Sequence, residues 1–313
     1  MIHMSAILFR RISMLFIVAF LLGLGKTVTI PANGAASLND LGLQQLVEVK
    51  EKQFGVRSGY RFEILARSNP FYLDINGGDA ANVPIMSNRL YVLGEAGNYG
   101  IGMGVMKHTA GLVYTRTNFM SGLLDVFDHD TQTFFLDNTY LRTGNWALSA
   151  GIRGTRIVNT ADGEKDYSGW TPNVSIGKLF QPGTRQSLWI RWRNSLTFSE
   201  ITGLAVDGSP FKGLTDDRLN HWSSGLGFTH GWAFAKNWTL DSRGSLDLSQ
   251  YSKGANQDRN DKLLNLGTAI QWDFLRYFSM AGFLDYSRRF SNLDKYSFSN
   301  WDGGVRLNAD IGF

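Results

Sequence analysis

The chain ends on the stretch GVRLNADIGF, residues 304–313, in which apolar and polar side chains alternate. Successive side chains of a β-strand point to opposite faces, so this period of two defines two faces. One face carries Val305, Leu307, Ala309, Ile311 and Phe313, and the other carries Gly304, Arg306, Asn308, Asp310 and Gly312. The stretch therefore predicts a strand with one apolar and one polar face that places an aromatic residue at the end of the sequence.

The same alternation recurs through the chain from about residue 55 onward. We expect about twelve strands, at 55–66, 85–94, 100–115, 131–142, 145–157, 169–180, 186–198, 218–234, 238–250, 263–274, 277–290 and 304–313. The connections between them alternate long and short, and the short ones are Glu95–Tyr99, Thr143–Gly144, Gln181–Arg185, Ala235–Asn237 and Leu275–Arg276. Within 131–142 apolar residues stand at both parities, so the pattern does not fix which face points outward there.

The other end of the sequence has the pattern of a secretory signal. Arg10 and Arg11 precede an apolar run of 13 residues, 12–24, and the small residues Ala35 and Ala36 follow. The run is shorter than the ~20 residues that a spanning helix needs. We expect residues 1–36 to be a cleaved signal peptide. Residues 37–54 are then a periplasmic segment, for which a short helix, a plug entering the lumen and a poorly ordered lead-in are all open.

Composition excludes two other classes. The chain has no cysteine, so an exported form has no disulfide framework and must be stabilised by its sheet. The formal net charge is +4, and removing the three cations of residues 1–36 leaves +1. Because no net basic field remains, we expect no nucleic-acid partner.

Taken together, the terminal strand, the signal and the alternating loop lengths resemble a Gram-negative outer-membrane β-barrel. The resemblance implies an all-β fold: an antiparallel, up-and-down transmembrane barrel over 55–313, with both termini periplasmic, in the cell outer membrane. In this class the terminal aromatic and the alternating residues before it, here Phe313 and Ile311, form the signal read by the barrel-assembly machinery. Partners would be that machinery, outer-membrane lipids and small hydrophilic solutes.

Charged residues recur at the polar parity of the expected strands, which would face the lumen. We expect the pore lining to include Arg57, Arg61, Arg153, Arg191, Arg193, Asp241, Arg243, Asp247, Asp273, Asp285 and Arg306. The only charged residues that the strands 145–157 and 186–198 contribute at this parity are arginines. The strands within 238–290 are rich in aspartate at the same parity. This predicts a basic wall partly facing an acidic wall, which is similar to the constriction of general porins.

Barrel size leaves two functions open for such a lumen. Eight-stranded barrels are filled by side chains and sixteen-stranded ones enclose an aqueous channel. About twelve strands lie between these limits, so we expect a narrow passive pore for small hydrophilic solutes. The alternative is a lumen sealed by cross-strand ion pairs, with a structural or assembly role.

An enzymatic alternative rests on the segment HWSSG, residues 221–225. It matches the His-x-Ser-x-Gly pattern of outer-membrane phospholipase A and is similar to that of lipid A deacylase barrels. The resemblance implies His221 as the base and Ser223 as the nucleophile, since residues i and i+2 share a strand face. Those enzymes point the pair toward lipid, whereas Trp222 and Leu226 here take the apolar parity. We therefore expect no hydrolase activity.

No cofactor or resident metal is expected. The acidic residues Asp125, Asp128 and Asp130, with His129, would suit a divalent cation by ligand type, but such groups in a loop are usually only solvated. The stretch 251–262 lacks the spacing of an EF-hand loop.

Overall fold

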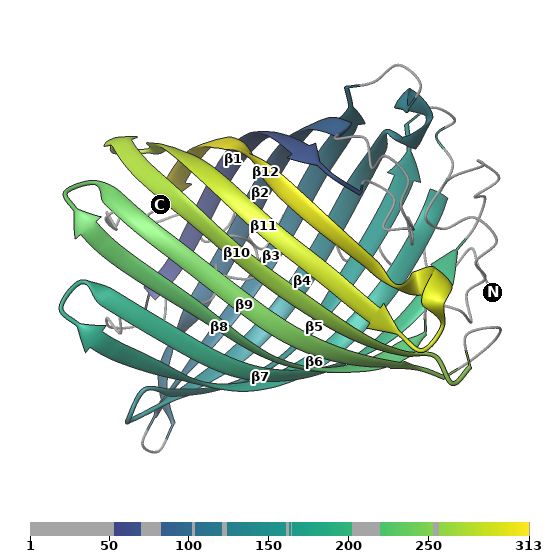
Figure 1. The fold of residues 1–313 in the computed structure, drawn as a ribbon. Helices are drawn as coiled ribbons and strands as arrows, with labels where there is room; N and C mark the ends of the chain where they lie inside the picture. The colour runs from purple at the N-terminus through teal and green to yellow at the C-terminus, as the bar shows by residue number, and fades with distance from the viewer. Residues whose placement is uncertain are drawn as a thin grey trace. The chain divides into compact units, whose positions relative to one another are not determined.

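The computed structural model describes residues 53–69, 83–101, 104–120, 124–160, 163, 165–201, 220–252 and 257–312. The expected signal (1–36), the segment 37–52 and Phe313 lie outside these ranges. Within them, twelve antiparallel strands form one closed barrel, in which each strand pairs with its sequence neighbours and β1 pairs with β12 (Figure 1). The expected fold is confirmed.

All twelve expected strands are present, most of them longer than the alternating pattern indicates. Their bounds are β1 Gln53–Arg67, β2 Val83–Ile101, β3 Gly104–Phe119, β4 His129–Arg142, β5 Trp146–Asn159, β6 Lys165–Gly183, β7 Gln186–Ile201, β8 His221–Ala235, β9 Trp238–Tyr251, β10 Asn260–Leu275, β11 Phe278–Ser291 and β12 Phe298–Gly312. Two short 3₁₀ turns, η1 at Asp125–Phe127 and η3 at Asp294–Tyr296, lie between strands.

The two largest differences from the expected boundaries are at the end of β2 and at the start of β12. The stretch Glu95–Tyr99 is part of β2, because a β-bulge leaves residue 98 without a partner between Gly97 and Tyr99 and lets pairing with β3 continue to Ile101. The last strand begins at Phe298, because Trp301 continues the apolar parity of Val305 while Asn300 and Asp302 continue the inner one.

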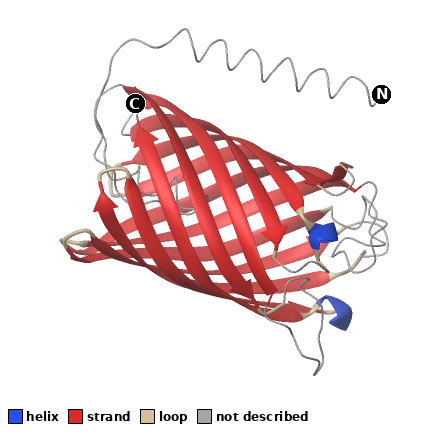
Figure 2. Cartoon of the chain, turned by 90° about the horizontal axis from the view of Figure 1, so that it is seen from above, coloured by secondary structure: helices blue, strands red, loops and turns tan. Residues whose placement is uncertain are grey.

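The barrel has two unlike ends. At one end, here called the turn end, short hairpin turns lie at 143–145, 184–185, 236–237 and 276–277. At the other, the loop end, the longer connections include η1 and η3. Figure 2 shows both helical turns in blue at this end. The alternation of long and short connections is therefore as the sequence predicts.

The closing pair of strands shows how one register separates the two faces. Phe62 lies opposite Leu307 and Ile64 opposite Val305, and these side chains are on the outer face. The intervening Glu63 lies opposite Arg306 on the inner face. A one-residue slip would place the charges in the apolar surroundings of the outer face, so the pattern specifies this register strongly.

The inner face also holds apolar clusters, which the sequence does not predict. Tyr91, Leu93, Val113 and Phe135 form one buried cluster on β2, β3 and β4. This explains why apolar residues stand at both parities of 131–142. One parity faces outward, and the other packs on the inner wall.

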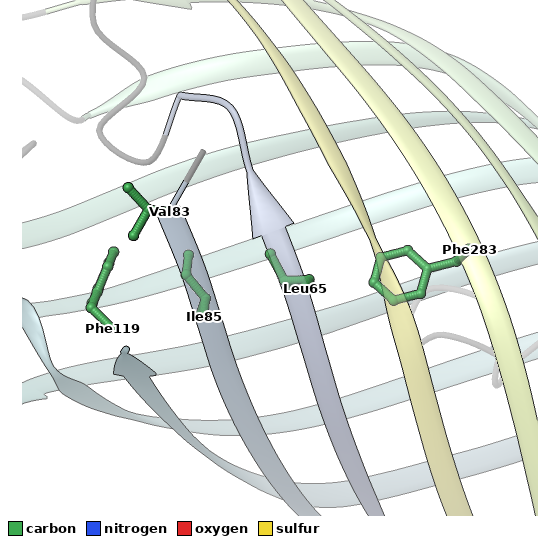
Figure 3. Close-up of a cluster of buried hydrophobic side chains, with 5 residues drawn as sticks. All are labelled: Leu65, Val83, Ile85, Phe119 and Phe283. Atoms are coloured by element: carbon green, nitrogen blue, oxygen red, sulfur yellow. The ribbon is translucent and has the colours of Figure 1, made fainter. Parts of the chain in front are cut away.

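A second inner cluster lies toward the loop end and consists of Leu65, Val83, Ile85, Phe119 and Phe283 (Figure 3). Leu65 and Phe283 come from β1 and β11, which flank β12, and the β12 residue between them is Gly304. The absence of a side chain at Gly304 leaves this space open, since a Cβ there would clash with the backbone of β1 and with Leu65. One wall of the lumen is therefore apolar and packed.

Candidate functional site: the charged lumen

The strand registers place the residues expected to line the pore on the inner face. Gly225 lies between Arg193 and Asp247, Gly227 lies opposite Arg191, and Phe135 lies opposite Arg153. The same inner parity holds for the rest of the set, namely Arg57, Arg61, Asp241, Arg243, Asp273, Asp285 and Arg306.

Part of this set lines a lumen cavity of about 490 Å³. Six arginines line it, namely Arg61, Arg89, Arg191, Arg193, Arg243 and Arg306, together with three carboxylates, Glu63, Asp285 and Asp302. Arg57, Arg153, Asp241, Asp247 and Asp273 are not among its lining residues. The structure therefore brings together about half of the charged residues that the sequence assigns to the pore.

The best-formed ion pair of the cavity crosses a glycine. Arg243 on β9 donates two hydrogen bonds from Nη2 to the carboxylate of Asp285 on β11, at 2.8 and 2.7 Å. The β10 residue between them is Gly267, which pairs with both. A Cβ at Gly267 would overlap Asp285 Oδ1 and lie 2.8 Å from Arg243 Nε. Any larger residue at position 267 would therefore displace this ion pair, which crosses directly over the middle strand.

Gly225 plays the same part between β7 and β9. Asp247 lies over it and forms an ion pair with Arg193 at 3.7 Å. The expectation of opposed basic and acidic walls is therefore wrong for these residues. The acidic strands are close neighbours of the arginine strand β7 in the barrel, and glycines between them let the charges pair along the wall instead of facing one another across the lumen.

Further polar contacts hold Arg306 and Arg61 near the wall. Arg306 pairs with Glu63 at 3.4 Å, and Arg61 donates from Nε to Asn308 Oδ1 at 2.8 Å. A ladder across β9, β10 and β11 joins Ser245, Asn265 and Ser287. All three of its members line the cavity.

Toward the turn end, two expected pore residues have partners of their own. Arg57 pairs with Asp310 at 3.7 Å, and Asp273 accepts a hydrogen bond from Gln271 Nε2 at 2.7 Å.

Trp189 and Asp302 are two of the lining residues that the sequence did not predict. Trp189 lies at the inner parity of Arg191 and Arg193, so parity alone could have placed it in the lumen. Asp302 was missed because the last strand was expected to begin at residue 304. It forms a two-point pair with Arg67 at 2.9 and 3.0 Å.

An arginine cluster occupies the inner face near the loop end. Arg259 is bonded to Asp261, and its guanidinium lies 4.4 Å from the Tyr251 ring centroid and 3.6 Å from that of Tyr296. Arg289 adds a second ion pair to Asp261 at 3.6 Å. Cation–π contacts of this kind fix a guanidinium firmly when it is shielded from water. This loop-end arginine cluster packs the β9–β12 side of the barrel.

Comparisons with known proteins support the architecture. No protein-family model matches the chain, and no curated protein matches its sequence. Among solved structures, an outer-membrane channel from Pseudomonas putida F1 has a TM-score of 0.51 at 10% identity, covering 84% of this chain and 97% of its own. The chain has the fold of a bacterial outer-membrane β-barrel.

Two further barrels are similar over most of their own length. The β domain of the Bordetella autotransporter BrkA has a TM-score of 0.46 at 14% identity, over 81% of this chain and 99% of its own. The NanC porin has a TM-score of 0.43 at 12% identity, over 82% of this chain and 99% of its own.

The outer face of this outer-membrane barrel fold carries an aromatic belt beside the turn end. Trp238 stacks on Trp272 with ring centroids 5.8 Å apart, and ring contacts continue on both sides. The belt consists of Trp232, Phe234, Trp238, Trp272, Phe274 and Phe278. Near the loop end, Tyr286 contacts Trp301 at 4.6 Å. A belt at one end and an aromatic pair toward the other lie where the interfacial girdles of membrane barrels lie.

The residues of the hydrolase pattern lie in the lumen near the loop end. Trp222 is exposed on the outer face, so His221 and Ser223 occupy the inner parity. The His221 ring lies 5.0 Å from that of Tyr251, and Ser223 lies opposite Ser195 and Ser249. Neither side chain is therefore presented to lipid. The phospholipase pattern would require both to face lipid.

The acidic loop before β4 has a structural role. Asp128 accepts hydrogen bonds from Asn118 Nδ2 and from the backbone N–H of Phe119, both at 2.7 Å. In the described parts of the chain, no group of three or more acidic, histidine or cysteine side chains is arranged to hold a metal ion. The same residues include no helix of the length and apolarity needed to cross a membrane.

Proposed function

We propose that the protein is a narrow passive channel for small hydrophilic solutes in the cell outer membrane, with its turn end toward the periplasm. One observation carries the proposal: a polar cavity of about 490 Å³ inside a closed barrel. Its lining of arginine, carboxylate, serine and asparagine side chains keeps water inside, since each of these groups needs hydrogen-bond partners. An apolar outer face with aromatic bands supports the membrane location.

Osmotic swelling of liposomes tests this proposal. Vesicles that contain the refolded full chain should swell in small neutral sugars, with a rate that falls steeply as the sugar grows. Asn265→Trp places a large side chain at the cavity and should slow swelling, whereas Ile270→Trp on the outer face of the same strand should not. Folded protein that admits not even the smallest sugar would refute the channel.

A sealed structural or assembly barrel is the second candidate. The inner apolar clusters and the loop-end arginine cluster favour it, because packed side chains there occupy part of the cross-section. The swelling assay separates the two candidates. A sealed lumen gives no flux for any solute, and Asn265→Trp then has no effect.

A further inference from the structure

The cavity carries more positive than negative charge. Six arginines against three carboxylates give its lining a formal excess of three positive charges. Low-dielectric walls focus such a field into the enclosed space. Any solute inside therefore meets a surface that favours anions.

Each lining carboxylate already has an arginine partner. Asp285 is bonded to Arg243, and Glu63 is paired with Arg306. Asp302 is neutralised from outside the lining, by the two-point pair with Arg67. Arg193 in turn pairs with Asp247, which lies outside the lining, so no lining carboxylate is left to balance the other arginines.

Arg89 is the clearest of these. Its Nε donates to Thr115 Oγ1 at 3.3 Å, and within the described stretches it takes part in none of the ion pairs of the lumen. Its neighbour across the β1–β2 register is Arg61, another lining arginine. Two guanidinium groups side by side repel each other, and the carboxylate that acts on both, Glu63, is already paired with Arg306.

Trp189 supplies an independent observation. It lines the cavity and is only 6% exposed, yet its Nε1–H has no hydrogen-bond partner among the described residues. Buried donors are normally satisfied, and leaving one without an acceptor destabilises a structure. A donor of this kind beside arginines suits an acceptor-rich ligand.

We infer that the cavity is a binding site for small oxyanions, carboxylates or phosphates, that pass through the barrel. Guanidinium forks match the geometry of both groups, and arginine is enriched where planar two-point recognition is needed. The volume of about 490 Å³ lies within the range of small-molecule sites, roughly 300–1,000 Å³. The inference deepens the proposed channel and rests on it for the entry of the solute.

Calorimetry on the refolded full chain in detergent tests the site. Inorganic phosphate and succinate are titrated separately at constant ionic strength in chloride, and glucose serves as the neutral comparison. Constant salt matters because screening alone alters anion binding. We expect heat of binding with phosphate, with succinate or with both, and none with glucose. The first two probes distinguish a phosphate site from a carboxylate site.

Matched variants assign the binding to the cavity. Arg89→Gln removes a charge-assisted donor without breaking an ion pair, and should weaken binding by about tenfold or more. Arg89→Lys, which keeps the charge but loses the fork, should weaken it less. Trp189→Phe changes no charge and should weaken binding by about three- to tenfold. Arg57→Gln removes a lumen arginine outside the cavity and should leave binding unchanged.

The outcomes separate the site from the channel. Absence of phosphate and succinate binding, or equal binding by wild type and Arg89→Gln, would overturn the oxyanion site even if the liposomes swell. Binding that depends on Arg89 and Trp189 would support the site. If the liposomes then fail to swell, the channel fails while the site stands.

Discussion

The substitution Gly267→Ala is a sharp test of how the lumen charges are arranged. The new Cβ would overlap Asp285 Oδ1 and crowd Arg243 Nε, so the two-point pair between these residues must separate or shift. Exposed ion pairs contribute about 0.2–1 kcal/mol, and breaking a buried pair costs about 3–5 kcal/mol. The two side chains are 37% and 23% exposed. We therefore expect the free energy of unfolding to fall by about 1–3 kcal/mol.

The assay is urea unfolding of the barrel folded into lipid vesicles, followed by tryptophan fluorescence. Gly282→Ala on the adjacent strand is the matched control, because a Cβ there meets nothing within 4 Å. That variant should be neutral or slightly stabilising. In the background Arg243→Gln with Asp285→Asn, the cost of Gly267→Ala should shrink, since no ion pair is left to break. Equal effects of the two alanine variants would refute the reasoning, as would an undiminished cost in the neutral background.

Three further predictions follow from the structure. Replacing Arg191 and Arg193 with glutamine should shift the ion preference toward cations, because lumen substitutions tune selectivity and Asp247 loses its partner. An unchanged reversal potential in a salt gradient would contradict this. Trp238→Leu removes the stacking on Trp272. It should therefore lower the free energy of unfolding by about 0.5–1.5 kcal/mol more than the loss of buried area alone would. Urea unfolding in vesicles measures this change. Wild-type protein should release no acyl chains from labelled phospholipid or lipid A, because Ser223 and His221 face the lumen; release that Ser223→Ala abolishes would prove this wrong.

Periodicity predicted the strands because lipid and water impose opposite demands on alternate residues. The outward residues Leu307 and Val305 and the inward Arg306 could be assigned from a single segment, without any knowledge of its neighbours. The same logic fails where both faces are apolar. Phe135 and Val113 pack inside the barrel, so alternation weakens in β3 and β4 although pairing is regular.

The composition of the cavity could not be predicted from one strand at a time. Whether Asp285 meets Arg243 depends on the registers of three strands and on the glycine between them. From the sequence we expected an acidic part and a basic part of the barrel wall to face each other across the lumen. The glycines at 225 and 267 instead allow pairing along the wall, and this leaves the cavity with an excess of arginine.

Single-channel recording in a planar lipid bilayer tests the central claim, that the barrel holds an open polar path, most directly. Purified protein whose folding has been verified by heat-modifiable migration on a gel is added to one side of the membrane. We predict discrete conductance steps, with a reversal potential in a potassium chloride gradient that shows preference for chloride. A folded barrel that inserts and gives no steps would contradict the account and leave the sealed lumen in its place.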